Sequence, residues 1–171
     1  RLSELAQLKT KDVLTDDPIP ALSITNLGAN QHLKTNASIR TIPIHSELIK
    51  LGFIEYVKNV RNKNGESLWP TLAQRKGKPG GYFSNWFGEY RASIGLLGYP
   101  DFHCFRHTVR SRLSEAEIPE HLIDSILGHE IKGSTGTKIY THRTIESLKK
   151  AIETLNYSNT DSPILPRIAM K

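Results

Sequence analysis

The residues whose types and spacing could do chemistry lie between His103 and Tyr140. His103 and Arg106 are three positions apart, so on a helix a proton-transfer group and a permanent cation would point towards the same place. His129 follows Gly128, where a second helix is expected to end, in a loop that can present its side chain. Tyr140 follows a GSTGT run that would let its phenol move into and out of a site. Together these side chains could bind an anion, transfer a proton and supply an oxygen nucleophile.

Each of these residues also has an ordinary structural explanation. HxxR alone is more often a polar helix face, a histidine after a C-cap glycine is most often structural, and Tyr140 could dock its loop on the core. A shared metal ion is a further alternative, because His103 and His107 are four positions apart with Cys104 between them. The HExxH pattern is absent, however, and no Cys/His cluster has zinc-finger spacing. We therefore predict no metal site.

The elements that must hold these side chains are mostly helices. Three short β-prone runs near the start of the chain predict a small antiparallel sheet, and the other apolar residues recur at helical spacing. The predicted fold class is mainly α with a small antiparallel β-sheet, that is, α+β. The expected strands are 11–14, 21–25 and 39–44, and the expected helices are 1–9, 47–60 with Ser46 as N-cap, 82–94, 102–113, 119–127 ending at Gly128, and 145–155 capped by Thr144.

Two of the predicted helices carry large apolar side chains at a spacing typical of a buried face. We expect both stripes to pack in the core. Their members are Phe83, Trp86, Phe87 and Tyr90 in the first helix, and Phe102, Phe105, Val109 and Leu113 in the second.

Composition narrows the class of protein. At 171 residues the chain suits one domain with a sizeable core. The formal charge of +6 and a pI near 9.5 favour a polyanionic partner. A single cysteine, Cys104, rules out an internal disulfide framework and indicates a reducing compartment. Because no apolar run approaches the ~20 residues that span a bilayer, we expect a cytoplasmic protein that does not enter a membrane.

Several short motifs follow one another along the chain in a characteristic order. They are Arg1-x-x-Glu4-x-x-x-Leu8, Lys34-Thr35 before RTIPI, His103-x-x-Arg106-His107-Thr108, Leu127-Gly128-His129, and Tyr140. This order resembles that of the tyrosine recombinases, the phage-type integrases. Each piece is weak, but HxxRHT followed by LGH and a tyrosine is highly specific in combination. The resemblance implies an integrase-like catalytic domain over 1–155, with the N-terminal core-binding domain of the family missing and a mobile tail over 156–171.

What the resemblance implies about activity is site-specific DNA recombination or integration. Tyr140 would be the nucleophile, attacking phosphorus to give a 3′-phosphotyrosine intermediate and a free 5′-OH. Arg1 and Arg106 would clamp non-bridging oxygens of the scissile phosphate, a task that suits planar guanidinium groups. The covalent link stores the phosphodiester energy, so neither a metal nor another cofactor is implied.

The same resemblance assigns the proton transfers. Lys34, in the loop between the last two strands, would protonate the 5′-oxygen leaving group, although it could equally be a solvated turn lysine. His103 would assist proton transfer at the tyrosine, and His129 would hydrogen-bond the phosphate. Arg1 is the terminal residue, so we expect its helix to lack a preceding turn and the fragment to be poorly active alone.

Double-stranded DNA is the expected partner, bound by a homo-oligomer that forms a tetrameric synapse. The helix over 145–155 resembles the segment that such recombinases donate to a neighbouring protomer, and packing within its own chain is the simpler alternative. A catalytically silent DNA-binding module of the same fold and a helical interaction domain remain rival functions. The expected contacts to DNA phosphates are Lys9, Lys11, Arg40, Arg75, Lys76 and Lys78, each of which could also be a solvated surface cation.

Overall fold

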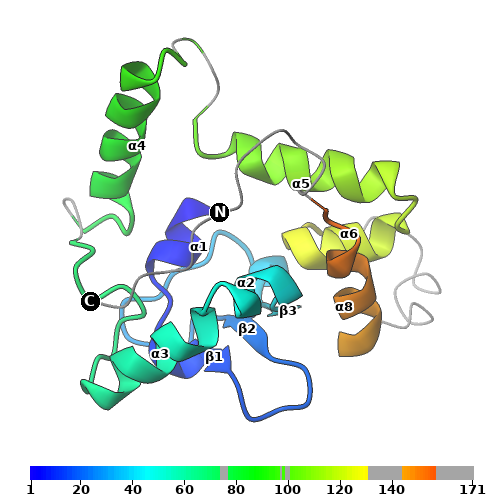
Figure 1. Cartoon of the computed structure of the whole chain (residues 1–171), viewed down its shortest axis with the longest axis horizontal. Coiled ribbons are helices and arrows are strands. Elements are labelled where there is room, and N and C mark those ends of the chain that lie inside the picture. Colours follow the sequence, from blue (N-terminus) through cyan, green and yellow to red (C-terminus); the bar gives the residue numbers. More distant parts are fainter. Residues whose placement is uncertain (74–76, 97, 99–100, 131–143, 157–171) are drawn as a thin grey trace.

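A three-stranded antiparallel sheet forms the centre of the first part of the chain (Figure 1). The computed structural model describes residues 1–73, 77–96, 98, 101–130 and 144–156. Leu22 in the middle strand faces Val13 on one side and Ile42 on the other, which confirms the predicted small sheet. The strands are β1 (Val13–Leu14), β2 (Ala21–Ile24) and β3 (Arg40–Pro43), with 3-10 turns at Thr10–Asp12 and Asn36–Ser38.

Helices make up most of the remaining regular structure, so the predicted α+β class is confirmed. The bounds are α1 (Leu2–Ala6), α2 (Ser46–Lys50), α3 (Phe53–Asn62), α4 (Gly81–Ser93), α5 (Cys104–Glu115), α6 (Glu120–Leu127) and α8 (Ile145–Glu153). In Figure 1, α2 and α3 lie near the sheet, α5, α6 and α8 lie on the other side of the picture from α4, and α4 stands apart from the sheet.

Two apolar clusters form the core, and Ile42 of β3 packs against both of them. The first joins the sheet to α3, and the second joins α5, α6 and α8. Because β3 contacts both clusters, it connects the sheet to the helices that carry the predicted histidine and arginine residues. The buried members of the first are Leu8, Val13, Ile24, Ile44, Phe53, Val57 and Leu68; those of the second are Leu113, Ile123, Ile126, Leu127, Leu148, Ala151 and Ile152.

The single helix predicted over 47–60 is wrong, because the chain forms two helices there. Gly52 has φ +92°, a left-handed conformation that interrupts α2 and starts α3 at a new angle. The N-cap of α2 is His45, whose Nδ1 accepts from the backbone N–H of Glu47 at 3.0 Å. Ser46, the predicted cap, lies inside the helix and its hydroxyl bonds Glu153 at 2.6 Å. The periodicity was compatible with both arrangements, and the glycine decides between them.

The two predicted aromatic and apolar stripes are only partly buried. No residue of α4 is buried, and Trp86 remains 53% exposed. Phe83 instead meets Phe102 edge to face at 5.4 Å. On α5, Leu113 is buried as predicted, but Phe105 is 51% exposed. The spacing therefore indicated the helices correctly, whereas burial depends on which elements pack against them.

Helix α8 packs within its own chain, on α6 and β3. Thr144 caps it as predicted, since its hydroxyl accepts from the backbone N–H of Ser147 at 3.2 Å. In this single chain, α8 therefore packs on its own domain, which is the simpler of the two arrangements considered from the sequence. Within the described residues, no helix is long and apolar enough to cross a membrane. The tail predicted to be mobile lies outside the described residues, apart from Asn156.

Candidate active site

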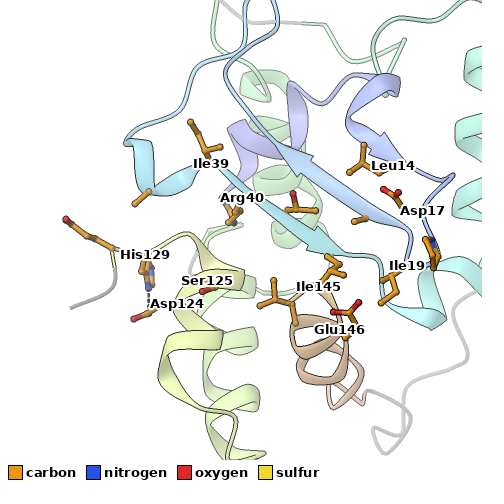
Figure 2. A pocket seen from close by; sticks show the side chains of 16 residues that line it. Leu14, Asp17, Ile19, Ile39, Arg40, Asp124, Ser125, His129, Ile145 and Glu146 are labelled. Carbon is orange, nitrogen blue, oxygen red and sulfur yellow. Dashed lines mark hydrogen bonds and ion pairs between the residues drawn. The ribbon is translucent and has the colours of Figure 1, made fainter. Parts of the chain in front are cut away.

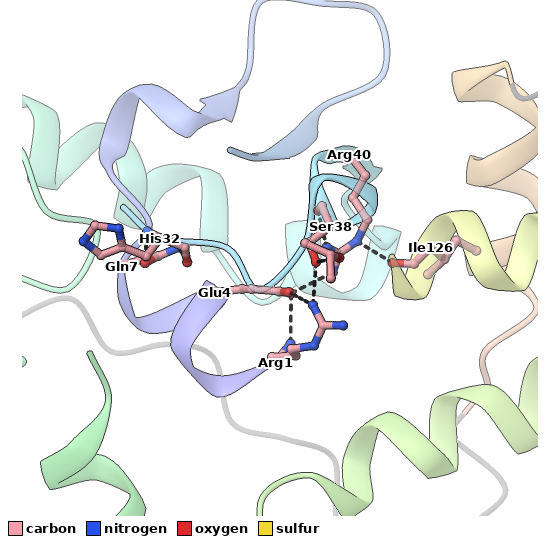
Figure 3. A network of polar contacts seen from close by, with 8 residues as sticks. Arg1, Glu4, Gln7, His32, Ser38, Arg40 and Ile126 are labelled. Carbon is pink, nitrogen blue, oxygen red and sulfur yellow. Dashed lines mark hydrogen bonds and ion pairs between the residues drawn. The ribbon is translucent and has the colours of Figure 1, made fainter. Parts of the chain in front are cut away.

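Glu4 holds two arginines on one buried carboxylate (Figure 3). Arg1 Nη1 donates to Oε1 at 2.6 Å, and Arg40 Nη2 donates to Oε2 at 2.9 Å. Burial raises the pKa of Glu4, but hydrogen bonding and attraction to Arg40, and attraction to the α-amino group of Arg1, outweigh it and lower that pKa to about 2. The carboxylate is therefore ionised at any working pH and fixes the direction of both guanidinium groups.

Arg40 also connects Glu4 to helix α6 through hydrogen bonds. Its Nε donates to the carbonyl of Ile126 at 2.9 Å, and its Nη1 donates to the carbonyl of Ser38 at 2.6 Å. The last carbonyls of a helix have no partner inside that helix, so the contact caps the end of α6. All three nitrogens of Arg40 thus donate to protein oxygens. This placement favours a structural role for Arg40 over the DNA contact predicted from the sequence.

Arg106 of α5 lines the same cleft as Arg1, a cavity of about 590 Å³ bounded by α1, α5 and the sheet. Its Nη2 is buried and has no hydrogen-bond partner among the described residues. Burial first, and then repulsion from Arg1 and Arg40, lower the pKa of Arg106 from its usual value. Three guanidinium groups around one carboxylate leave a net positive charge there. A buried cationic N–H without a partner is costly, so an anion entering this cleft would be stabilised.

His103 lies at the entrance of α5 and lines the cleft with Arg1 and Arg106. It is the N-cap of the helix and not part of its interior, and its backbone N–H donates to Asp101 Oδ1 at 2.8 Å. Burial, followed by repulsion from His107 and Arg106, lowers the pKa of His103. The ring is therefore neutral near pH 7 and able to accept a proton. The rings of His103 and His107 lie edge to face at 5.1 Å.

Lys34 lies in the connection between β2 and β3, as predicted, and is exposed. The next residue, Thr35, shares a hydrogen bond with the hydroxyl of Ser38 at 3.1 Å. That hydroxyl also accepts from Arg1 Nη1 at 2.7 Å. The loop of Lys34 is thereby tied to the arginine of the cleft, although Lys34 itself does not line it.

His129 lies on the other side of Arg40, beside a second cavity of about 770 Å³ between the sheet, α6 and α8 (Figure 2). Gly128 ends α6 in the left-handed conformation, with φ +68°. The chain therefore turns back, and the His129 ring comes within 3.2 Å of Asp124 Oδ1. Arg40 lines both cavities, but His129 does not line the cleft of Arg1 and Arg106, so the structure does not bring these predicted residues together in one cavity.

Other predicted residues are placed less centrally. Tyr140, Arg75 and Lys76 lie outside the described residues. Lys9 pairs with the exposed Glu66, whereas Lys11 and Lys78 are exposed, and Lys78 borders the cleft. Among the described residues, no group of three or more His, Cys, Asp or Glu side chains could hold a metal ion.

Sequence reasoning gave no role to three charged residues that the structure places beside the site: Glu4, Asp124 and Arg110. The RxxE spacing was a signal for Glu4, because residues three apart on a helix can pair. Asp124 and Arg110 lie on different helices, and their contact at 3.1 Å has no local signature.

Replacing Glu4 with glutamine is expected to destabilise the protein by about 3 kcal/mol at neutral pH, because two partly buried cations lose their buried counter-ion. The native state binds the Glu4 proton more weakly than the unfolded chain, so this contribution is complete above pH 4.5 and is lost as pH falls towards 2. The stability difference between wild type and variant should therefore shrink over that window in urea unfolding. Glu66→Gln, at a carboxylate 76% exposed and paired with Lys9, should change stability little. An equal loss of stability in both variants would contradict the stabilising role assigned to the contacts of Glu4 with Arg1 and Arg40.

Replacing Gly128 with alanine is expected to cost roughly 1–3 kcal/mol, from left-handed strain and from a clash with Arg40. An added Cβ would lie 2.7 Å from Arg40 Nη1, in a guanidinium group that three hydrogen bonds hold in place. Gly95→Ala is the matched control, since Gly95 has φ +79° and open space around it. Thermal unfolding should show a larger loss for Gly128, and the excess over Gly95 measures the contact with Arg40. Equal losses of stability in the two variants would show that the contact with Arg40 contributes nothing to the effect.

Comparison with known proteins identifies the family of the chain. Residues 1–147 match the profile of the phage integrase family. The chain is 32% identical over 137 residues to a tyrosine recombinase XerC-like protein of Caldanaerobacter subterraneus subsp. tengcongensis, covering 72% of this chain and 34% of that protein. It is 42% identical over 57 residues to a prophage ps2 probable integrase of Lactococcus lactis subsp. lactis, covering 33% of this chain and 15% of that protein.

The chain thus spans about a third or less of the length of these relatives. No solved structure matches it. The family profile covers most of the described residues, including those around the cleft. The chain belongs to the phage integrase family.

Proposed function

We propose that this chain is the catalytic part of a DNA recombinase that cleaves and rejoins strands through a 3′-phosphotyrosine intermediate. The observation that carries the proposal is the cleft in which Arg1, His103 and Arg106 come together although about a hundred residues separate Arg1 from the other two. Their charges and the buried, unpartnered Nη2 of Arg106 suit a phosphodiester. A cavity for an uncharged ligand would not need two arginines beside a neutral histidine.

In the proposed cleavage step, the phenol oxygen of Tyr140 attacks phosphorus and the bond from phosphorus to the 5′-oxygen breaks. The phenol proton passes to the neutral ring of His103, and Lys34 protonates the departing 5′-oxygen. Arg1 and Arg106 stabilise the charge that develops on the non-bridging oxygens. Rejoining reverses these transfers: a 5′-OH gives its proton to Lys34 and attacks phosphorus, and the tyrosine recovers its proton from His103.

His129 is proposed to donate a hydrogen bond to the same phosphate from the other side of Arg40. The exposed Lys11 and Lys78 would add phosphate contacts that give affinity and salt dependence without sequence information. Arg75 and Lys76 are proposed for the same role, and the active assembly is proposed to be a homo-oligomer on double-stranded DNA.

A nicked duplex tests this function directly. The duplex carries the attachment site of the parent element, with the nick placed so that the cleaved fragment diffuses away and the covalent intermediate accumulates. We expect an adduct that survives denaturing electrophoresis, forms without added metal and carries the 3′ end of the cleaved strand. Binding without any adduct would favour a catalytically silent DNA-binding module. Neither binding nor an adduct, with the parent protein equally inactive, would favour an interaction domain.

A further inference from the structure

We propose that Asp124 is a positioning residue that holds the ring of His129 by Nδ1, so that a proton on Nε2 faces the phosphate. The inference rests on the proposed function, in which His129 donates to that phosphate. Figure 2 shows Asp124 and His129 joined beside the second cavity. Asp124 acts here through the histidine and touches no reacting atom.

The turn after α6 brings the two residues together twice. The backbone N–H of His129 donates to the carbonyl of Asp124 at 2.9 Å, and the ring Nδ1 lies 3.2 Å from the Asp124 carboxylate. Gly128 makes this possible through its left-handed conformation. The Asp124 side chain is 13% exposed, and that of His129 is 38% exposed. The buried end of the ring is therefore anchored, and the outer end is left to meet a ligand.

Arg110 of α5 completes the arrangement. Its Nη1 lies 3.1 Å from Asp124 Oδ1 and 3.3 Å from His129 Nδ1, while its Nη2 pairs with Glu120. Its hydrogen bond with Asp124 raises the pKa of Arg110, so this cation persists. The carboxylate thus has a permanent partner and keeps its place whether or not His129 is charged.

These contacts, together with an approaching phosphate, restrict where the proton of the His129 ring can lie. If Nδ1 is bare, it accepts from Arg110, and the neutral ring must carry its proton on Nε2. If the ring is charged, Nδ1–H donates to Asp124 and Nε2 is again protonated. In the remaining form, with the proton on Nδ1 alone, a bare Nε2 would face a phosphate oxygen and be repelled. An approaching phosphate therefore selects the two forms in which Nε2 donates.

The test combines a DNA-free measurement with the adduct assay. Long-range proton–nitrogen NMR reports which ring nitrogen of His129 carries a proton, and His129→Gln identifies its signals. Asp124→Asn keeps the shape of the side chain but removes its charge. We expect the Nδ1 signal to move towards that of a bare nitrogen. Nε2 then donates from a ring that no carboxylate anchors, which gives a weaker hydrogen bond than a charged ring would. Adduct formation should therefore slow by roughly 10–100-fold, the range seen when carboxylate partners of metal-bound histidines are removed. Asp124→Glu should recover part of the rate.

Glu120→Gln is the matched control, because Glu120 contacts the same Arg110 from the same helix but not His129. It should leave both measurements close to wild type. Unchanged His129 signals in Asp124→Asn would overturn the proposal, as would equal effects of the two substitutions. Because the NMR measurement uses no DNA, it decides the positioning role even if no adduct forms. Wild-type adduct formation by His129→Gln, with shifted signals in Asp124→Asn, would instead refute the assigned role of His129.

Discussion

Replacing Tyr140 with phenylalanine is expected to abolish the covalent adduct while leaving DNA binding unchanged. The substitution removes only the oxygen that would attack phosphorus and keeps the ring. A phenol has a pKa near 10, so it depends on cationic surroundings to act near neutral pH. Under the proposed function, the cleft of Arg1, Arg40 and Arg106, whose positive charges act on one another, would supply such surroundings. Adduct formation on the nicked duplex and an electrophoretic mobility shift would be measured in parallel.

The control for this prediction is Tyr90→Phe, which removes the same oxygen from an exposed tyrosine on α4. It should form the adduct at the wild-type rate. An adduct that persists in Tyr140→Phe would refute the nucleophile assignment, and peptide mapping of that adduct would identify the residue attached. Loss of the adduct in both variants would indicate that the substitutions impair DNA binding and not the chemical step.

Replacing Arg106 with lysine is expected to slow adduct formation by about 10²–10³-fold, the range typical of losing one donor to a developing oxyanion. Lysine keeps the charge but lacks the planar fork that can bind two phosphate oxygens together. The Nη2 of Arg106 is the buried donor without a described partner, so it is the atom whose loss should matter most. DNA affinity should change much less than the rate, since one charge is retained.

Arg112→Lys is the control on the same helix. Arg112 donates to the backbone carbonyl of Asn156 at 2.8 Å and does not line the cleft. Its substitution should change the adduct rate by less than about threefold, in keeping with a surface position. A wild-type rate for Arg106→Lys would show that point charge alone suffices there. If DNA affinity fell by the same factor as the rate, Arg106 would be assigned to DNA binding. Its proposed role in stabilising the transition state would then be refuted.

The Glu4 network separates these catalytic effects from structural ones. Glu4→Gln should lower both stability and rate, because the same carboxylate directs Arg1 and, through Arg40, supports the end of α6. Arg106 has no such structural partner among the described residues, so Arg106→Lys should slow the reaction with little change in unfolding. The ratio of the two losses distinguishes a residue that holds the site from one that acts in it.

Much of the fold was predictable because its signals are local. Apolar spacing identified α4, α5, α6 and α8, and the turn residues separated three strands correctly. The helix break at Gly52 was missed because a continuous apolar face spans it. The exposure of Trp86 and Phe105 was missed because an amphipathic pattern shows which side of a helix is apolar, and not whether another element covers that side.

The sequence by itself determined the family of the chain and its α+β class, and it predicted which side chains could do chemistry, because motif spacing and periodicity are properties of neighbouring residues. Only the tertiary structure decided how the described side chains meet. It set Arg1 and Arg106 in one cleft, joined Glu4 of α1 to Arg40 of β3, and directed Arg40 to the end of α6. Those contacts link residues far apart in the chain, and their partners are chosen by packing and by the need of buried charges to be paired.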